Sequence, residues 1–311
     1  MDPRVDAAGV VLAGGRSSRM GTPKAALEWH GSTLLYRTAA LLARTVGGPV
    51  IVVSAPGQEL PRLPSGVGVV TDPVPGLGPL QGIAAGLAAV SGAAGLAAVS
   101  GAAAAAFVCS TDLPFLHPAF VRCVLSALDR PPGVDAGARA ETGVAPFDVA
   151  PFDVAPVDVA LPFARGYRQP LAAAYRTALA GPITQLLAAG KRRPGMLFER
   201  CRVAQLDDAV LLADPAVAAL DPGLESVTNI NEPADYAAAR ARVPEPVAVE
   251  VACGRRTVRA ASLGGAAAAV GAALNGACAI TVNGREVQPD PHFPLVAGDT
   301  VAFSAVRTPT D

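Results

Sequence analysis

Residues 10–24 read VVLAGGRSSRMGTPK, and the rest of the chain is organised around this stretch. It begins as an apolar run typical of a buried strand, turns through Gly14 and Gly15, and closes on Lys24. Because glycine has no Cβ, backbone N–H groups in such a turn can approach a ligand closely and form an anion-binding concavity. Arg19 and Lys24 add donors that suit phosphate oxygens. The stretch therefore predicts a phosphate-binding loop at the end of a strand.

The spacing of the stretch is neither that of a Walker loop nor that of a G-x-G-x-x-G loop. It resembles L-A-G-G-x-S-x-R-M-G-x-x-K, the nucleotide-binding signature of the nucleotidyltransferases, and every fixed position of that pattern is present. The Leu-Ala-Gly-Gly form most resembles the molybdenum cofactor guanylyltransferases. The resemblance extends over roughly residues 8–240.

Short apolar runs alternate with helical spacing in the first part of the chain. We expect strands at residues 9–13, 49–53 and 67–71 and a helix over 32–45. This alternation predicts an α/β fold with a doubly wound, mostly parallel, Rossmann-like sheet of the nucleotidyltransferase type. In such sheets ligands bind outside the carboxyl ends of the strands. Ser54 and Asp72 both fall at such ends.

A second candidate site motif is AFVCSTDLPF at residues 106–115. An apolar strand leads to Asp112, and Pro114 then forces a turn. Aspartate before proline also occurs in ordinary turns, but the phosphate-binding motif upstream favours a metal site. Mg²⁺ prefers one or two carboxylates together with phosphate oxygens and water. The resemblance likewise implies a metal-binding aspartate at this position.

The resemblance implies transfer of GMP from GTP to the phosphate of molybdopterin cofactor, with release of pyrophosphate and dependence on Mg²⁺. It implies catalytic roles for Arg19, Lys24 and Asp112, with Asp112 as the metal ligand. The residues expected to contact the nucleotide are Leu12, Ala13, Gly14, Gly15, Lys24, Ser54, Asp72 and Asp112. Ser54 departs from the family pattern, which often has asparagine there.

Three further motifs have two interpretations each. Residues 75–83 either form an ordinary turn or open a helix beside the nucleotide. The basic triplet 191–193 is either a solvated helix end or a contact for the phosphate of the second substrate. Asn231 has the composition of a helix N-cap, with proline and acidic residues following it. The family shows a similar N-x-N-x-P-x-D string beside its site, so Asn229 and Asn231 are also site candidates.

Two low-complexity insertions are expected within a nucleotidyltransferase domain spanning residues 1–242. Residues 86–94 recur unchanged as residues 95–103, which lengthens a helix or its following loop. Residues 131–160 contain a proline–aspartate repeat that begins at Val144, and proline at this spacing prevents a helix. We expect an extended surface tract there.

The C-terminal part, residues 247–311, follows a linker at 243–246 and predicts a small β-grasp-like α+β domain. Its strand–strand–helix–strand order and its Gly298-Asp299-Thr300-Val301 string resemble the ubiquitin-like sulfur carriers, namely molybdopterin synthase small subunit and its thiamine counterpart. Those carriers end in Gly-Gly, whereas this chain ends in Asp311. The resemblance therefore leaves a docking role toward a protein of the cofactor pathway, and we expect residues 1–243 to catalyse the transfer alone.

Composition restricts the class of protein. The formal net charge is −1, from 25 basic and 26 acidic residues, which gives no electrostatic case for nucleic acid or a membrane surface. The 5 cysteines are scattered and lack a C-x-x-C spacing, which favours reduced thiols in the cytoplasm. The uncharged segment 74–111 is rich in alanine, glycine and serine, and it is a poor candidate for a transmembrane helix.

Three other functions remain in view. A cytidylyltransferase of the same family would more often carry Leu-Ala-Ala-Gly, against Gly14. A non-catalytic scaffold would not need Lys24 and Asp112. A sulfur carrier would need the Gly-Gly tail that the chain lacks.

Overall fold

The protein is described here from a computed structural model. The structure describes residues 4–14, 23–74, 76–92, 103–130, 157–275 and 278–305. Most of both expected insertions, residues 93–102 and 131–156, lies outside this part of the chain, as does the end of the chain from residue 306.

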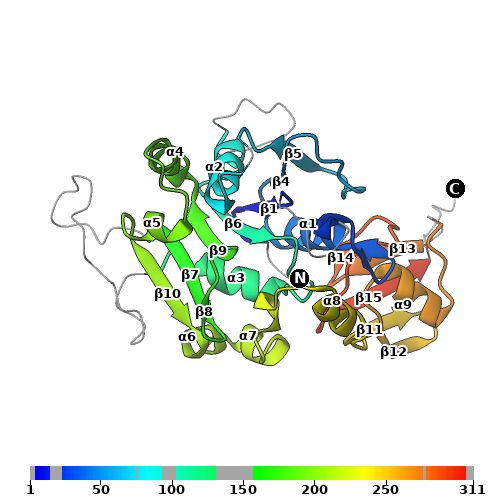
Figure 1. Ribbon diagram of the computed structural model, residues 1–311. Helices are drawn as coiled ribbons and strands as arrows, with labels where there is room; N and C mark the ends of the chain where they lie inside the picture. Colours follow the sequence, from blue (N-terminus) through cyan, green and yellow to red (C-terminus); the bar gives the residue numbers. More distant parts are fainter. Residues whose placement is uncertain are drawn as a thin grey trace, which may run out of the picture.

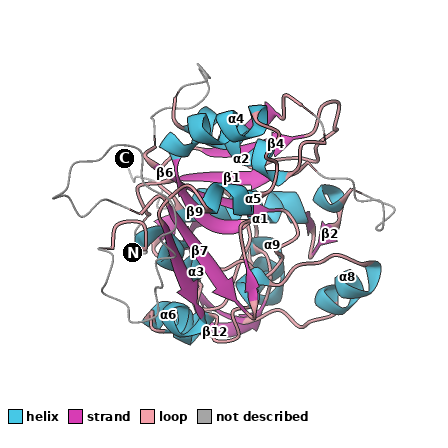
Figure 2. Ribbon diagram, turned by 60° about the vertical axis from the view of Figure 1, so that its left-hand side comes forward, coloured by secondary structure: helices cyan, strands magenta, loops and turns pink. Residues whose placement is uncertain are grey.

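The larger domain is built on an 8-stranded sheet in the order β10-β7-β9-β6-β1-β4-β5, with β8 paired to β7 (Figures 1 and 2). Its strands are β1 (Ala8–Leu12), β4 (Val50–Ser54), β5 (Val67–Thr71), β6 (Ala105–Ser110), β7 (Val159–Ala164), β8 (Tyr167–Arg168), β9 (Ala172–Arg176) and β10 (Val203–Asp207). β9 runs antiparallel to both of its neighbours and β8 antiparallel to β7, while the other pairings are parallel. The predicted mostly parallel α/β sheet is confirmed.

Helices cover both faces of this sheet and close two apolar layers. The α-helices are α1 (Leu34–Thr45), α2 (Pro79–Val90), α3 (Pro118–Ser126), α4 (Ala180–Ala188), α5 (Pro194–Phe198), α6 (Asp208–Leu212), α7 (Pro215–Leu220) and α8 (Pro233–Arg240), and the 3-10 helices are η1 (Lys24–Ala26), η2 (Thr177–Leu179) and η3 (Glu225–Val227). One apolar layer joins the sheet to α1, α3, α6 and α7. The other joins it to α2, α4 and α5. Every residue of β1 and β4 is buried, as expected for central strands of a doubly wound sheet.

Two glycines allow α2 to lie directly against β1. A Cβ added to Gly86 would stand 2.3 Å from Val10 Cγ1, and one added to Gly82 would stand 3.2 Å from Leu12 Cδ2. The helix therefore begins close to the end of β1, with Pro79 in its first turn. Of the motif at 75–83, residues 79–83 form the start of a helix at this edge of the sheet.

The repeat tract ends earlier than expected. Residues 157–160 were expected within the surface tract, but Val157 is buried and β7 begins at Val159, which has no exposed surface. β7 lies between β10 and β9 in the sheet, so its apolar side chains pack against helices on both faces. The expectation of a surface tract was wrong for these four residues because Val157-Asp158-Val159-Ala160 continues into an apolar strand.

The C-terminal domain is a 5-stranded sheet in the order β12-β11-β15-β13-β14, with α9 (Leu263–Val270) packed on one face. Its strands are β11 (Pro246–Val251), β12 (Gly254–Arg259), β13 (Cys278–Val282), β14 (Arg285–Glu286) and β15 (Thr300–Ala305). β15 lies between β11, to which it is parallel, and β13, to which it is antiparallel. The expected strand–strand–helix–strand order is confirmed as a small β-rich domain, and it lies beside α1 (Figure 1).

A small hairpin links the first motif to α1. β2 (Glu28–Trp29) pairs with β3 (Ser32–Thr33), and the turn between them uses positive φ at His30 and Gly31. Among the described residues, no helix has the length and apolar character needed to cross a bilayer.

Candidate active site

The predicted site residues lie along one edge of the large sheet. β1, β4, β5 and β6 are parallel, so their carboxyl ends meet there. Gly14 follows β1, Ser54 ends β4, Asp72 follows β5 and Asp112 follows β6. The edge therefore brings together residues that are far apart in the sequence, as the parallel topology predicted.

Lys24 and Asp112 form an ion pair at the centre of this edge. The distance from Lys24 Nζ to Asp112 Oδ2 is 3.0 Å, and the two side chains are 20% and 17% exposed. Lys24 Nζ also donates to Asn231 Oδ1 at 3.1 Å. Partial exposure leaves both charged groups within reach of a ligand, so three segments of the chain converge on one accessible cluster.

Hydrogen bonds on both sides fix the position of Asp112. The Ser110 hydroxyl donates to Asp112 Oδ1. The backbone N–H of Ile230 donates to the carbonyl of Asp112 at 3.0 Å, which ties this loop to the segment that carries Asn231. Phe115 then packs edge-on against Trp29, with their ring centroids 5.6 Å apart. The carboxylate thus sits on a loop that is anchored at several points.

Asn231 is beside the site rather than at a helix N-cap. The N-cap of α8 is Glu232, one residue later. The Asp235 carboxylate accepts from the backbone N–H groups of both Asn231 and Glu232, at 3.2 and 3.0 Å. This leaves the Asn231 side chain to accept from Lys24. Asn229 instead donates to the carbonyl of Val227 at 3.3 Å.

The start of the phosphate-binding motif differs in detail from the expectation. Gly14 does not adopt positive φ, and its N–H donates to the carbonyl of Val53 at 3.2 Å, so this N–H is already used. A Cβ at Gly14 would lie 3.3 Å from the backbone nitrogen of Ala55, so close approach of another backbone explains this glycine. Leu12 and Ala13 are buried behind it. Gly15 and Arg19 lie outside the described residues.

Gln58 belongs to this part of the site and was missed in the sequence. Its side-chain amide donates to the carbonyl of Ala13 at 3.0 Å, while its oxygen accepts from the N–H of Ala55 at 2.9 Å. Gln58 therefore joins the first motif to the loop after β4. A lone glutamine after Pro56-Gly57 gives no signal in the sequence that would reveal this contact.

Ser54 and Asp72 lie side by side at the ends of their strands. The Asp72 N–H donates to the carbonyl of Ser54 at 2.8 Å. The Ser54 hydroxyl is buried and points back to the carbonyl of Val70, at 3.4 Å. Asp72 is half-buried, and its Oδ1 accepts from the N–H of Val74 at 3.1 Å, which orients the carboxylate. Asp72 is thus the better placed of the two to contact a ligand.

Two sets of basic residues lie at the same edge. A Cβ at Gly78, the N-cap of α2, would lie 3.6 Å from the carbonyl oxygen of Arg192, so the basic triplet 191–193 lies beside the start of α2. The hairpin between β7 and β8 extends from the edge at Arg165, and it exposes Tyr167 (74%) and Arg168. The sequence signal for this hairpin, Arg-Gly-Tyr-Arg after an apolar strand, was not interpreted as part of the site.

Cys109 precedes this cluster in β6 and is fully buried. Burial, and then the nearby negative charge of Asp112, raise the pKa of its thiol well above the usual range. The thiol is therefore protonated at neutral pH and does not act as a nucleophile. This agrees with a site in which the attacking group comes from a substrate.

The donor set at this edge fits a hard cation such as Mg²⁺. Asp112 offers a partly exposed carboxylate at the end of a strand, next to the Lys24 ammonium group. Within the described parts of the chain, no group of three or more His, Cys, Asp or Glu side chains could hold a metal. A single protein carboxylate is nonetheless common for Mg²⁺, whose other ligands are phosphate oxygens and water.

This chain is similar to several known proteins. The model of a family described as MobA-like NTP transferase domain matches residues 9–209. A probable molybdenum cofactor guanylyltransferase of Mycobacterium tuberculosis (strain ATCC 25618 / H37Rv) is 36% identical over 197 residues, which are 63% of this chain and 80% of that protein. One from Mycobacterium ulcerans is 34% identical over 213 residues, or 67% and 88% of the two chains. The crystal structure of molybdopterin-guanine dinucleotide biosynthesis protein A from Archaeoglobus fulgidus covers 75% of this chain and 96% of its own, with a TM-score of 0.49 and 21% identity.

Proposed function

Because the chain belongs to the MobA-like NTP transferase domain family and is therefore a nucleotidyltransferase, we propose that it transfers GMP from GTP to the phosphate of molybdopterin cofactor. The products are the guanine dinucleotide form of the cofactor and pyrophosphate. The names of the mycobacterial relatives support this choice of substrates.

The observation that carries the proposal is the contact between Lys24 and Asp112 at the carboxyl edge of the sheet. The Lys24 ammonium group contacts the α-phosphate region of the nucleotide and offsets negative charge that builds up during transfer. Arg19, in the same motif, adds a second cation. Removing preorganised contacts of this kind typically lowers a rate by about 10²–10³.

The reaction needs no general base from the protein. The acceptor is a phosphate oxygen, which is already ionised at neutral pH, and it attacks the α-phosphorus of GTP as pyrophosphate leaves. The task of the chain is to align the two substrates and to neutralise charge. Asp112 would hold Mg²⁺, which supplies charge neutralisation at the phosphates when it is bound.

The two substrates divide the edge of the sheet between them. The guanosine lies over β1, β4 and β5, where the Asp72 carboxylate accepts hydrogen bonds from the guanine edge or the ribose. The acceptor lies on the other side of Asp112, toward the β7–β8 hairpin. Arg168 on that hairpin and the triplet 191–193 beside α2 supply positive charge for a phosphorylated substrate, whereas the guanidinium of Arg165 is paired with Glu225.

We infer that the C-terminal β-rich domain is a ubiquitin-like β-grasp unit, and its strand order β12-β11-β15-β13-β14 supports this inference. We propose that this domain has a docking role in the cofactor pathway rather than a role in sulfur transfer. A thiocarboxylated C-terminus, detected by mass spectrometry of protein purified from cells, would contradict this role.

The experiment that tests the function uses the full-length protein with Mg²⁺, molybdopterin cofactor and each of the four NTPs, and measures pyrophosphate release. GTP should give the highest kcat/KM. Equal or faster turnover of CTP would favour the cytidylyltransferase alternative. Binding of GTP without pyrophosphate release would favour a scaffold.

A further inference from the structure

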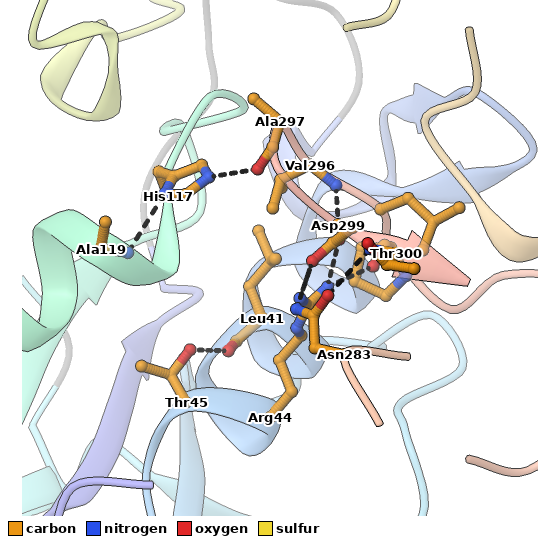
Figure 3. A network of polar contacts seen from close by, with 12 residues as sticks. Leu41, Arg44, Thr45, His117, Ala119, Asn283, Val296, Ala297, Asp299 and Thr300 are labelled. Carbon is orange, nitrogen blue, oxygen red and sulfur yellow. Dashed lines mark hydrogen bonds and ion pairs between the residues drawn. The ribbon is translucent and has the colours of Figure 1, made fainter. Parts of the chain in front are cut away.

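The two domains meet along α1, whose side chains form most of their polar contacts. Arg44 places its guanidinium on the Asp299 carboxylate, with Nη1 2.9 Å from Oδ2 (Figure 3). It also donates to the carbonyl of Pro294 at 2.9 Å. The two charged side chains are only 11% and 2% exposed. Tyr36, in the first turn of α1, donates to Asp290. The domains are therefore joined by buried, directional contacts.

Arg37 on the same helix reaches both domains at once. Its Nε donates to the carbonyl of Pro114 at 2.9 Å, in the loop that follows Asp112. Its Nη1 and Nη2 donate to the carbonyls of Ala261 and Leu295 in the C-terminal domain, at 3.1 and 3.5 Å. The side chain is buried, and burial lowers its pKa to about 10, so it remains charged at neutral pH.

His117 makes a second link at the other end of the same loop. Its Nδ1 accepts from the N–H of Ala119 at 3.1 Å, so the ring proton is on Nε2, which donates to the carbonyl of Ala297 at 3.0 Å (Figure 3). The loop from Asp112 to His117 is thus bonded to the C-terminal domain through Arg37 near its middle and through His117 at its end.

We propose that Arg37 is a positioning residue through which the docked C-terminal domain holds the loop that carries Asp112. Without the carbonyls of Ala261 and Leu295, a buried guanidinium would keep a charge with too few acceptors. It would then turn toward water and release Pro114. The catalytic consequence rests on the proposed function, whereas the coupling between domain and loop does not.

Coupling of this kind is reciprocal. If docking of the C-terminal domain orders the Asp112 loop, then ligand binding at Asp112 strengthens the docking by the same factor. A protein that binds the C-terminal domain and shifts it would change turnover at a site that it does not touch. The domain is thereby a control element for the transfer site.

Hydrogen exchange in the full-length protein tests the coupling without any need for turnover. The loop and the start of α3 contain bonded amides at Leu116, His117 and Ala119. Arg44→Met removes the buried pair with Asp299 and leaves every hydrogen bond of the loop in place. We expect faster exchange both in residues 290–299 and in residues 111–121.

Arg62→Met is the matched control. Arg62 also contacts the C-terminal domain, at 2.9 Å from Asp290, but its side chain is 64% exposed, so the loss of this contact should leave the domain docked. This variant should leave exchange in residues 111–121 unchanged. Faster exchange in 290–299 of Arg44→Met with unchanged exchange in 111–121 would overturn the proposal.

Kinetics provide a second measurement. Displacing reactive groups by about 1 Å can cost on the order of 10²-fold in rate, so Arg44→Met should lower kcat about tenfold or more while the KM for GTP changes much less. His117→Asn keeps a side-chain oxygen to cap α3 but does not reach Ala297, and it should lower kcat by a smaller factor. An unchanged kcat in both variants, in an active wild type, would contradict the catalytic part. A wild type that does not transfer GMP would refute the proposed function and leave the exchange result to decide the coupling.

Discussion

At the scale of single residues, the central observation is that Lys24, Asp112 and Asn231 meet although the last two are 88 and 207 positions from the first. Lys24 and Asp112 were predicted from sequence motifs. Lys24 closes a glycine turn and Asp112 follows a strand, and both features can be identified from the neighbouring residues alone. The contact with Asn231 was not predicted, since an asparagine before Glu-Pro suits a helix cap equally well, and only the position of α8 distinguishes the two roles.

Lys24→Ala and Asp112→Asn should each lower kcat by about 10²–10³. Both side chains are partly exposed, so the melting temperature should change little. Steady-state pyrophosphate release and thermal unfolding of the same preparations check this pair of effects. Arg202→Gln, at a partly exposed surface ion pair with Asp158 on the opposite edge of the sheet, serves as the comparison. Activity within about threefold of wild type in either variant would exclude the role given to that residue.

His117 makes the stability of the protein depend on pH. Burial lowers the pKa of His117 below the ordinary value of about 6.5, and its bond to Ala297 and the charge of Asp299 only partly offset this. Because the folded pKa is lowered, the neutral ring is favoured in the folded state, and stability present above pH 6.5 is lost as the pH falls toward the folded value. The melting temperature should therefore decrease between pH 7 and pH 5.

The variant His117→Asn separates this contribution from the others. His30 is also partly buried, and burial lowers its pKa, so it titrates in the same direction. The variant should be less stable than wild type at pH 7 but should lose less stability on going to pH 5. An equal loss in both proteins would show that His117 is not responsible.

At the scale of elements, the local sequence predicted the bounds of individual strands better than it predicted how the elements pack against one another. β5 occupies residues 67–71 as expected, because its β-branched run is bounded by Gly66 and Asp72. The boundary at β7 was missed, because valine and proline recur on both sides of it. The docking of the C-terminal domain on α1 left no pattern in the sequence, since its contacts go largely to backbone carbonyls.

The packing of α2 on β1 predicts unequal effects for two glycine-to-alanine substitutions. At Gly86 the new methyl group would lie 2.3 Å from Val10 Cγ1 in the core, and overpacking of this kind costs about 1–3 kcal/mol. At Gly195, in α5, nothing lies within 4 Å of the added Cβ, and the gain in helix propensity is about 0.5–1 kcal/mol. Urea denaturation of the two variants measures both. A stable Gly86→Ala protein would show that α2 can move away from β1.

Deletion across the repeat tract should define its boundary. We expect removal of residues 144–153 to leave the melting temperature and turnover nearly unchanged, because proline at that spacing does not suit a helix or a strand interior. Removal of residues 151–160 takes away Val159 and Ala160, which have no exposed surface, and should lower the melting temperature by many degrees. Equal effects of the two deletions would contradict this boundary.

At the scale of the whole molecule, the two domains are joined by a buried ion pair between Arg44 and Asp299. Removing one partner of a buried pair costs about 3–5 kcal/mol, so Arg44→Met should lower the free energy of unfolding by an amount of this order. Calorimetry should show one transition for wild type and a lower or divided one for the variant.

The same contacts revise the expectation that residues 1–243 catalyse the transfer alone. A chain cut at residue 243 would leave Arg37 and His117 without their C-terminal partners. We therefore expect such a fragment to be less stable and less active than the whole chain.

The connection between the domains is short, running from the end of α8 at Arg240 to the start of β11 at Pro246. A tether of this length holds the C-terminal domain against α1 at an effective concentration on the order of millimolar. The docked state therefore does not depend on how much protein the cell makes. A separate copy of the domain, or a free protein with a similar surface, would have to exceed that concentration to replace it.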